Sequence, residues 1–293
     1  MAVRTEAGAG RAPARGGNAG HGVLAAVRRR PLGAFFLLAY LISWGYWVPV
    51  AVTGGHLSHF PGLLGPMLAA FVVSAATAGR AGVADLLRRM VRWRVPVRWY
   101  AAVLVPLAAA AAALAVASAF GDPPSLDQLS RMPGLPAAGW LAVFAFTFLV
   151  NGYGEETGWR GFAWPRLRER HGLAGAALLL TGPWALWHLP TFWLDTGLRG
   201  FAPVMVPGFL GGMAAGAVVL GWLYERTRAS VLVVALWHSA LNMASATEGT
   251  EDVAAAATVA VIVWAVLILR AERRRAAAQG GAGRGGRPTP WMR

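Results

Sequence analysis

Long apolar segments alternate with short gaps that contain arginine along most of the chain. The apolar segments cover roughly residues 33–53, 61–79, 99–119, 137–157, 173–194, 203–223, 230–247 and 252–269. Each is close to the ~20 residues that an α-helix needs to cross the hydrocarbon layer of a membrane. The pattern predicts an all-α, polytopic membrane protein with about eight transmembrane helices.

The basic residues predict how these helices are oriented. Every basic residue is an arginine, and all but Arg131 and Arg199 lie in the two tails or in one alternate set of gaps. Arginine is enriched on the cytoplasmic side of membrane proteins. We therefore expect a multi-pass protein of the plasma membrane, with an even number of spans and both termini in the cytoplasm.

The two ends of the chain differ in composition from its centre. Residues 1–30 and 271–293 are rich in Arg, Gly and Ala and lack apolar periodicity, which predicts disordered cytoplasmic tails. Residues 31–270 between them form one membrane domain. The gap at 80–98 mixes Leu, Val, Met and Trp with arginines, and we interpret it as an amphipathic anchor at the cytoplasmic interface rather than a ligand site.

Composition excludes several classes of function. Of the 293 residues, 56% are hydrophobic and only 14% are charged, too apolar for a soluble globule of this length. The net charge of +14 does not indicate a nucleic-acid partner, because the arginines lie between apolar segments rather than along one polar face. The absence of cysteine excludes disulfides, thiolate metal sites and cysteine nucleophiles. The lipid bilayer is the expected partner, and the sequence does not define an oligomeric state.

Two adjacent glutamates, Glu155 and Glu156, follow the fourth apolar segment in the stretch GEETGWRG. A carboxylate in the centre of a membrane helix costs on the order of 2.5–3.5 kcal/mol, so the pair needs partners or a wet cavity. Arg160 lies one helical turn after Glu156, which predicts an ion pair between them. Glu155 points about 100° away on a helix and has no partner on its own helix.

Two histidines and an asparagine lie inside other apolar segments. His188 falls in LLLTGPWALWHLPTFWL and His238 in VLVVALWHSALNMA, and Asn242 follows His238 by one helical turn. Distances along the helices place these residues at a depth similar to that of Glu155. We expect them to converge on Glu155 from different helices and to line an enclosed polar cavity within the membrane. The other histidines fall in tails or gaps, and we expect them to be solvated: His21, His56, His59 and His171.

This set of residues suits hydrolysis by an activated water molecule. A desolvated carboxylate is a competent general base, and an amide N–H can stabilise an oxyanion. Two imidazoles can hold the water or bind a divalent metal, although the HExxH pattern of soluble zinc proteases is absent. The alternative is that the histidines pack the interior and the glutamates form a structural ion pair.

Three motifs resemble those of one known family. EETGWRG resembles the EExxxR motif of the CPBP family of intramembrane proteases, which includes the CAAX prenyl endopeptidase Rce1 and bacterial Abi-like proteins. WALWH is similar to the second motif of this family, with Trp184 where Phe is usual, and HSALN matches the third motif, HxxxN. The similarity extends from about residue 83 to residue 247.

The resemblance implies roles for individual residues. Glu155 would polarise the attacking water with His188, while His238 and Asn242 would stabilise the oxyanion. The second glutamate and its arginine would hold the helix. The choice between a metalloprotease, with zinc on Glu155, His188 and His238, and a glutamate-type mechanism without metal stays open.

The function implied is an endopeptidase that cuts a membrane-associated protein or peptide from the cytoplasmic half of the membrane. A second hypothesis is a catalytically inactive scaffold or regulator, for example of the bacteriocin-immunity type, that uses the same cavity for binding. An ion or proton transporter is a third, but the chain lacks inverted repeats. The residues define neither the cleavage sequence nor the biological role.

Overall fold

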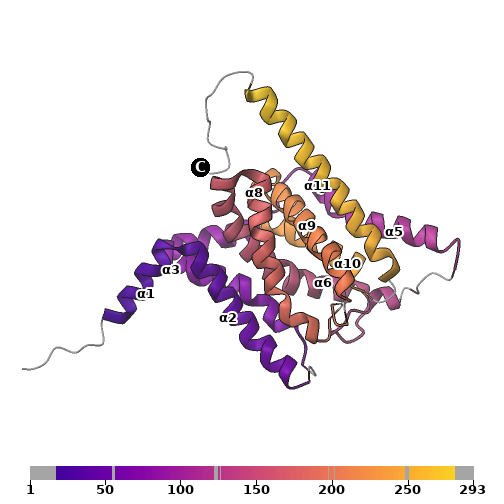
Figure 1. The fold of residues 1–293 in the computed structure, drawn as a ribbon, viewed down its shortest axis with the longest axis horizontal. Coiled ribbons are helices and arrows are strands. Elements are labelled where there is room, and N and C mark those ends of the chain that lie inside the picture. The colour runs from indigo at the N-terminus through magenta and orange to yellow at the C-terminus, as the bar shows by residue number, and fades with distance from the viewer. Residues whose placement is uncertain are drawn as a thin grey trace, which may run out of the picture.

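The computed structural model describes residues 18–54, 57–121, 125, 127–196, 198–200, 202–247 and 251–280. This part of the chain is helical and has no strands (Figure 1). Its α-helices are α1 (Asn18–Arg29), α2 (Pro31–Val52), α3 (Gly65–Met90), α4 (Arg98–Val103), α5 (Val105–Ala117), α6 (Trp140–Thr147), α7 (Tyr153–Gly158), α8 (Trp164–Trp187), α9 (Val206–Arg226), α10 (Val231–Ser245) and α11 (Glu251–Gly280). Short 3-10 helices are η1 (Phe60–Leu64), η2 (Gln128–Ser130), η5 (Leu189–Trp193) and η6 (Pro203–Met205). Two π-helical turns, η3 (Phe148–Gly152) and η4 (Trp159–Ala163), lie on either side of α7.

Each predicted span overlaps one or more of these helices, so the polytopic helical fold is confirmed. Within the described residues, four helical stretches are long and apolar enough to cross a membrane unaided: Pro31–Val52, Phe60–Met90, Pro203–Arg226 and Ala254–Ala278. The remaining predicted spans correspond to shorter or interrupted helices. Helices α5 and α10 are apolar but short, and the predicted fourth span is divided among α6, η3 and α7.

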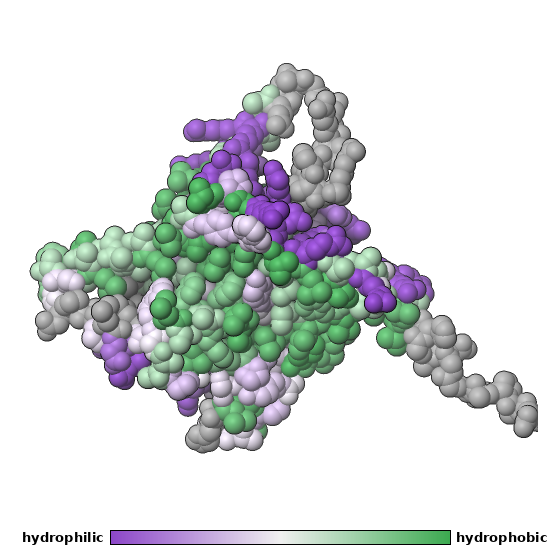
Figure 2. Space-filling model, turned by 180° about the vertical axis from the view of Figure 1, so that it is seen from behind, coloured by the Kyte–Doolittle hydropathy of each residue, from purple (hydrophilic) through white to green (hydrophobic). Residues whose placement is uncertain are grey.

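The outer surface is that of a membrane protein. Large hydrophobic side chains are exposed along the outward faces of the helices, among them Leu37 and Leu41 on α2, Leu178 on α8 and Leu267 on α11. Hydrophobic residues cover the middle of the molecule, and hydrophilic residues gather toward its upper end (Figure 2). Contiguous exposed apolar surface of this extent marks contact with lipid.

The structure corrects the predicted limits of the tails. Residues Asn18–Arg29, expected to be disordered, form helix α1, and Arg28 Nε donates a hydrogen bond of 3.0 Å to the Ala76 carbonyl oxygen of α3. At the other end, α11 continues to Gly280, ten residues beyond the predicted boundary. Alanine and arginine are strong helix formers, so a composition typical of disorder also supports these helices. Residues 1–17 and 281–293 lie outside the described residues.

The prediction of a solvated His59 is also wrong. Its side chain is buried, and a Cβ atom added to Gly134 would lie 2.9 Å from His59 Nδ1. Burial lowers the pKa of His59 to about 4, although a backbone hydrogen bond and the charge of Asp195 act in the opposite direction. His171 is exposed, as predicted, whereas the side chain of His21 and the whole of His56 lie outside the described residues.

Helices α3 and α8 each contain one backbone break at a glycine. Gly79 has φ 59° and ψ −149°, and Gly172 has φ 66° and ψ −175°. Glycine adopts this region of φ without the strain that a side chain would cause. The breaks separate the arginine-rich part of each helix, residues 80–90 and 164–171, from its apolar part.

The centre of the bundle is built around α7. Helix α3 packs against α2 and α7, while α10 packs against α5, α7 and α9. Helix α9 in turn packs against α8 and α11, which forms one edge of the molecule in Figure 1. The helix that carries the two glutamates is therefore enclosed on several sides by other helices.

Candidate active site

The glutamates lie on a helix that is held tightly between its neighbours. Added Cβ atoms would lie 2.6 Å from the Leu63 carbonyl oxygen at Gly154, 2.6 Å from Pro66 at Gly158 and 2.8 Å from the Ala235 carbonyl oxygen at Gly152. These glycines let the backbone of this region approach η1, α3 and α10 more closely than any side chain would allow. The π-helical turns before and after α7 change the rotation of its side chains relative to a regular α-helix.

Glu156 is shared by two partners. Its Oε1 atom accepts a hydrogen bond of 2.8 Å from Arg160 Nη1 and lies 2.7 Å from His238 Nδ1. Glu156 and Arg160 are wholly buried, and His238 is 7% exposed. The predicted Glu156–Arg160 pair is thus confirmed, and the contact with His238 adds a link from α7 to α10 that the sequence did not predict.

Glu155 has a different partner. Its Oε2 atom accepts a hydrogen bond of 2.7 Å from Trp184 Nε1 on α8. The carboxylate is buried, and no other hydrogen bond to Glu155 is found within the described part of the chain. We expected both histidines to be its partners, but His238 is instead hydrogen-bonded to Glu156. The Oε1 atom of Glu155 is left as a free acceptor.

The Trp184 ring lies close to three polar side chains of the site, those of Arg160, His188 and His238. The ring lies beneath the Arg160 guanidinium, with 4.3 Å between the guanidinium carbon and the ring centroid. The same ring lies 5.9 Å from the His238 ring and 6.1 Å from the His188 ring, measured between centroids. The sequence indicated only an aromatic residue at this position, since nothing local shows which acceptor the indole N–H will meet.

His188 follows the last turn of α8 and is half-buried. Its Nδ1 atom lies 2.8 Å from the Trp184 carbonyl oxygen, which can only accept, so Nδ1 carries the proton. Its Nε2 atom makes no hydrogen bond within the described residues. The edge of its ring meets Trp187, with 4.8 Å between the centroids. Its ring centroid lies 6.1 Å from that of Trp184, so His188 lies beside the residue that binds Glu155.

Two asparagines complete the surroundings of the cluster. Asn242 is half-buried on α10, one turn after His238, and its side chain makes no hydrogen bond within the described residues. Asn151 was not singled out from the sequence, although it lies one turn before Glu155. Its Oδ1 atom is buried without a hydrogen-bond partner among the described residues. An isolated amide in the apolar run FAFTFLVNGYG was the signal that could have revealed it.

The arrangement of these residues can be compared with the polar cavity and the metal site that the sequence predicted. Two grooves in the described part of the molecule lie away from the glutamates, one between α3 and the η4–α8 segment and one between α2 and η5. Among the described residues, no three His, Asp or Glu side chains are grouped so that they could hold a metal ion. The set Glu155, His188 and His238 is not grouped closely enough in this arrangement to form a zinc site.

The fold and the buried Glu, Arg and His cluster define a helical membrane protein with a polar site between α7, α8 and α10. A family model of type II CAAX prenyl endopeptidases, Rce1-like, matches residues 137–244. The protein "CAAX prenyl protease 2" of Methanococcus maripaludis is 22% identical over an alignment that covers 71% of this chain and 82% of that protein. The chain is therefore similar to type II CAAX prenyl endopeptidases, and both matches support a CAAX-protease-like endopeptidase.

Proposed function

We propose that the protein is an intramembrane endopeptidase that hydrolyses a peptide bond of a membrane-associated protein or peptide through a water molecule activated by Glu155. The observation that carries the proposal is the state of the Glu155 carboxylate. It is buried and is held at Oε2 by Trp184, which leaves Oε1 without a partner among the described residues. A carboxylate fixed in this way is suited to act as a general base.

The free nitrogen atoms of the two histidines supply the remaining functions. Each histidine is engaged at Nδ1, His188 by the Trp184 carbonyl oxygen and His238 by Glu156, so each directs Nε2 away from these contacts. In the proposed reaction, Glu155 Oε1 and His188 Nε2 hold the water. His238 Nε2 and the Asn242 amide stabilise the oxyanion that forms on the substrate.

Glu155 can carry out both proton transfers that the proposed reaction requires. Glu155 takes a proton as the water oxygen bonds to the carbonyl carbon, which forms the tetrahedral oxyanion. The C–N bond then breaks, and Glu155 returns the proton to the leaving amine. Glu156 and Arg160 do not react in this scheme, because Glu156 positions His238 and Arg160 neutralises Glu156. This is the glutamate-type mechanism, and cleavage that disappears on zinc removal and returns with zinc would instead support the metalloprotease.

The position of the site in the membrane and the name of the similar Methanococcus protein suggest a class of substrate. The name of the Methanococcus protein makes a prenylated peptide with a CAAX end the first substrate to test. The arginine-rich ends of α3, α8, α9 and α11 indicate that the cytoplasmic side is next to Arg160, and we propose that substrates enter from that half with both termini in the cytoplasm. Residence in the plasma membrane belongs to the same proposal.

The decisive test is Glu155→Gln, which keeps the size of the side chain and an acceptor for Trp184 but removes the base. The rate of cleavage of a farnesylated CAAX peptide, measured with purified protein in nanodiscs, should fall by about 10²–10⁴-fold. Glu272→Gln, a change of the same type at a half-exposed position, is the matched control and should cleave at the parental rate.

The scaffold hypothesis makes the opposite prediction for the same residue. If Glu155→Gln and His188→Ala proteins insert, fold and retain the full cellular phenotype, the site binds a partner without cutting it. Parental turnover of the peptide by Glu155→Gln protein would contradict the role of Glu155 in catalysis.

A further inference from the structure

A second polar site lies next to η4, the π-helical turn that follows the glutamate-bearing helix α7. It is a groove of about 380 Å³ between α3 and the segment formed by η4 and the start of α8. One end is lined by Ser74 and Thr77, before the break at Gly79, and the other end carries charged residues of both helices. The groove therefore runs from the apolar part of α3 into the arginine-rich part.

The charged end contains two cations with unequal partners. Arg89 forms an ion pair of 2.5 Å with Asp85 and donates a hydrogen bond of 2.8 Å to the Tyr224 hydroxyl group. Arg166 donates to the Phe162 carbonyl oxygen at 2.7 Å and lies over the Phe162 ring, but no carboxylate lies within ion-pair distance of it in the described residues. Both guanidinium-bearing residues line the same groove.

The fourth charged group in the groove is Glu169. It is exposed, it attracts Arg166 over a longer distance, and it makes no hydrogen bond or ion pair of its own within the described residues. The groove thus holds two guanidinium groups and two carboxylates, of which only Arg89 and Asp85 satisfy one another. An anion alone would match the guanidinium groups but would face the unpaired carboxylate.

We propose that this groove binds a phosphate ester that also carries an ammonium group, supplied by an aminophospholipid of the phosphatidylethanolamine type in the cytoplasmic leaflet. The phosphate bridges Arg89 and Arg166, because guanidinium groups bind phosphate oxygens through paired N–H donors. The ammonium group pairs with Glu169. The Ser74 and Thr77 end lies where the glycerol and ester groups would follow the headgroup toward the hydrocarbon.

The location supports a lipid source. Positively charged residues gather at the cytoplasmic ends of membrane helices, at the level of the lipid headgroups. The groove also reaches η4, the turn that carries Arg160, because Gly161 of η4 lines it together with Leu86 of α3. A bound lipid would fill the space between α3 and η4 without touching Glu155.

The test measures binding and does not depend on proteolysis. The full-length protein, delipidated in detergent, is melted with phosphatidylethanolamine, with phosphatidylglycerol of the same acyl chains, and with soluble glycerophosphoethanolamine. Ligand in excess of its Kd should raise the melting temperature by about 3–5 °C, and phosphatidylethanolamine should have the largest effect. An equal or larger shift with phosphatidylglycerol would overturn the zwitterionic assignment. A full shift with the soluble headgroup at the same concentration would overturn the lipid as its source.

Three variants locate the effect. Arg166→Gln should lose the shift with either lipid, whereas Glu169→Gln should lose only the preference for phosphatidylethanolamine. Arg170→Gln, an exposed neighbour outside the groove, should behave as the parent. A shift in Arg166→Gln equal to that of the parent would overturn the proposed site. If Arg166→Gln does not fold, Glu169→Gln provides the test, because an unchanged preference for phosphatidylethanolamine in that variant would also overturn the proposal. If the parent protein shows normal lipid shifts but cleaves no peptide, the result contradicts the proposed protease and leaves the proposed lipid site unaffected.

Discussion

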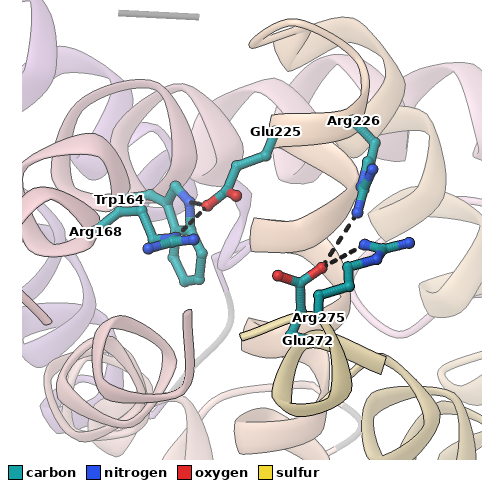
Figure 3. A network of polar contacts seen from close by, with 6 residues as sticks. All are labelled: Trp164, Arg168, Glu225, Arg226, Glu272 and Arg275. Atoms are coloured by element: carbon teal, nitrogen blue, oxygen red, sulfur yellow. Dashed lines mark hydrogen bonds and ion pairs between the residues drawn. The ribbon is translucent and has the colours of Figure 1, made fainter. Parts of the chain in front are cut away.

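The protein contains two networks of charged residues that differ in how deeply their side chains are buried. In the candidate active site, Glu156 binds Arg160 and His238, with the side chains of Glu156 and Arg160 wholly buried. At the arginine-rich ends of α8, α9 and α11, Glu225 binds Arg168 and Trp164, and Glu272 binds Arg226 and Arg275 (Figure 3). The charged side chains of this second network are 14–54% exposed.

The difference in burial sets the energetic role of each network. A buried ion pair loses its hydration, and removing one partner leaves a charge that nothing compensates. An exposed pair exchanges its contact for water at little cost. Glu156 Oε2 and Arg160 Nε and Nη2 are buried without hydrogen bonds in the described residues, so the buried network is not even fully satisfied. Such an arrangement is costly for stability and is expected where a site must hold His238 in place.

The largest expected effect comes from breaking the buried network at Arg160. Arg160→Met leaves Glu156 with only His238 as a partner and should reduce the free energy of unfolding by about 3–5 kcal/mol. Arg226→Met removes an arginine from the exposed network and is the control. Chemical unfolding of both proteins in the same micelles measures the difference. Equal losses for the two variants would show that burial does not separate the networks.

The next effect comes from the glycines that let α7 approach α3. At Gly158 a Cβ atom would lie 2.6 Å from the Pro66 carbonyl oxygen, a backbone atom that cannot move aside. Gly158→Ala should cost about 1–3 kcal/mol through overpacking and should lower cleavage by displacing Glu155. Gly182→Ala in α8 is the control, because an added Cβ there meets nothing within 4 Å. Unfolding and peptide cleavage are measured together, and a neutral Gly158→Ala would contradict the close packing.

The two networks also show what sequence can and cannot predict. The Glu156–Arg160 pair follows from a local rule, since residues one helical turn apart are neighbours on any α-helix. The contacts of Glu156 with His238 and of Glu155 with Trp184 join residues 82 and 29 positions apart and depend on how α7 is rotated. The π-helical turns of η3 and η4 set that rotation, and no hydrophobic period reveals them.

The same limit applies to the fold. Apolar segments predicted a helix at each of the expected positions, because hydrocarbon permits few other structures. They did not predict that the fourth span would be divided, that Asn18–Arg29 would be helical or that His59 would be buried, because each of these depends on packing or on short-range propensity.

His59 is a buried histidine whose ring, unlike that of His238, makes no hydrogen bond to a carboxylate side chain within the described residues. Its pKa is lowered from 6.5 to about 4, so the unfolded chain binds more protons than the folded one between these values. Stability should therefore fall as the pH is lowered through this window, by about 1–2 kcal/mol at pH 5. His59→Leu should reduce the slope, and His171→Leu, at an exposed position, should not. Thermal unfolding from pH 7 to 5 provides the measurement, and identical slopes in parent and His59→Leu would be incompatible with a neutral buried ring.

The smallest effect is expected at the exposed end of the comparison. Glu272 binds Arg226 at 3.2 Å and Arg275 at 2.7 Å, with 32% of its own side chain exposed. Glu272→Gln should change the free energy of unfolding by no more than about 1 kcal/mol, since exposed pairs are screened by water and salt. The difference between parent and variant should shrink further in 0.5 M salt, about three times the physiological ionic strength. A loss as large as that of Arg160→Met would mean that α11 is held to α9 by this contact rather than by the apolar surface that the two helices share.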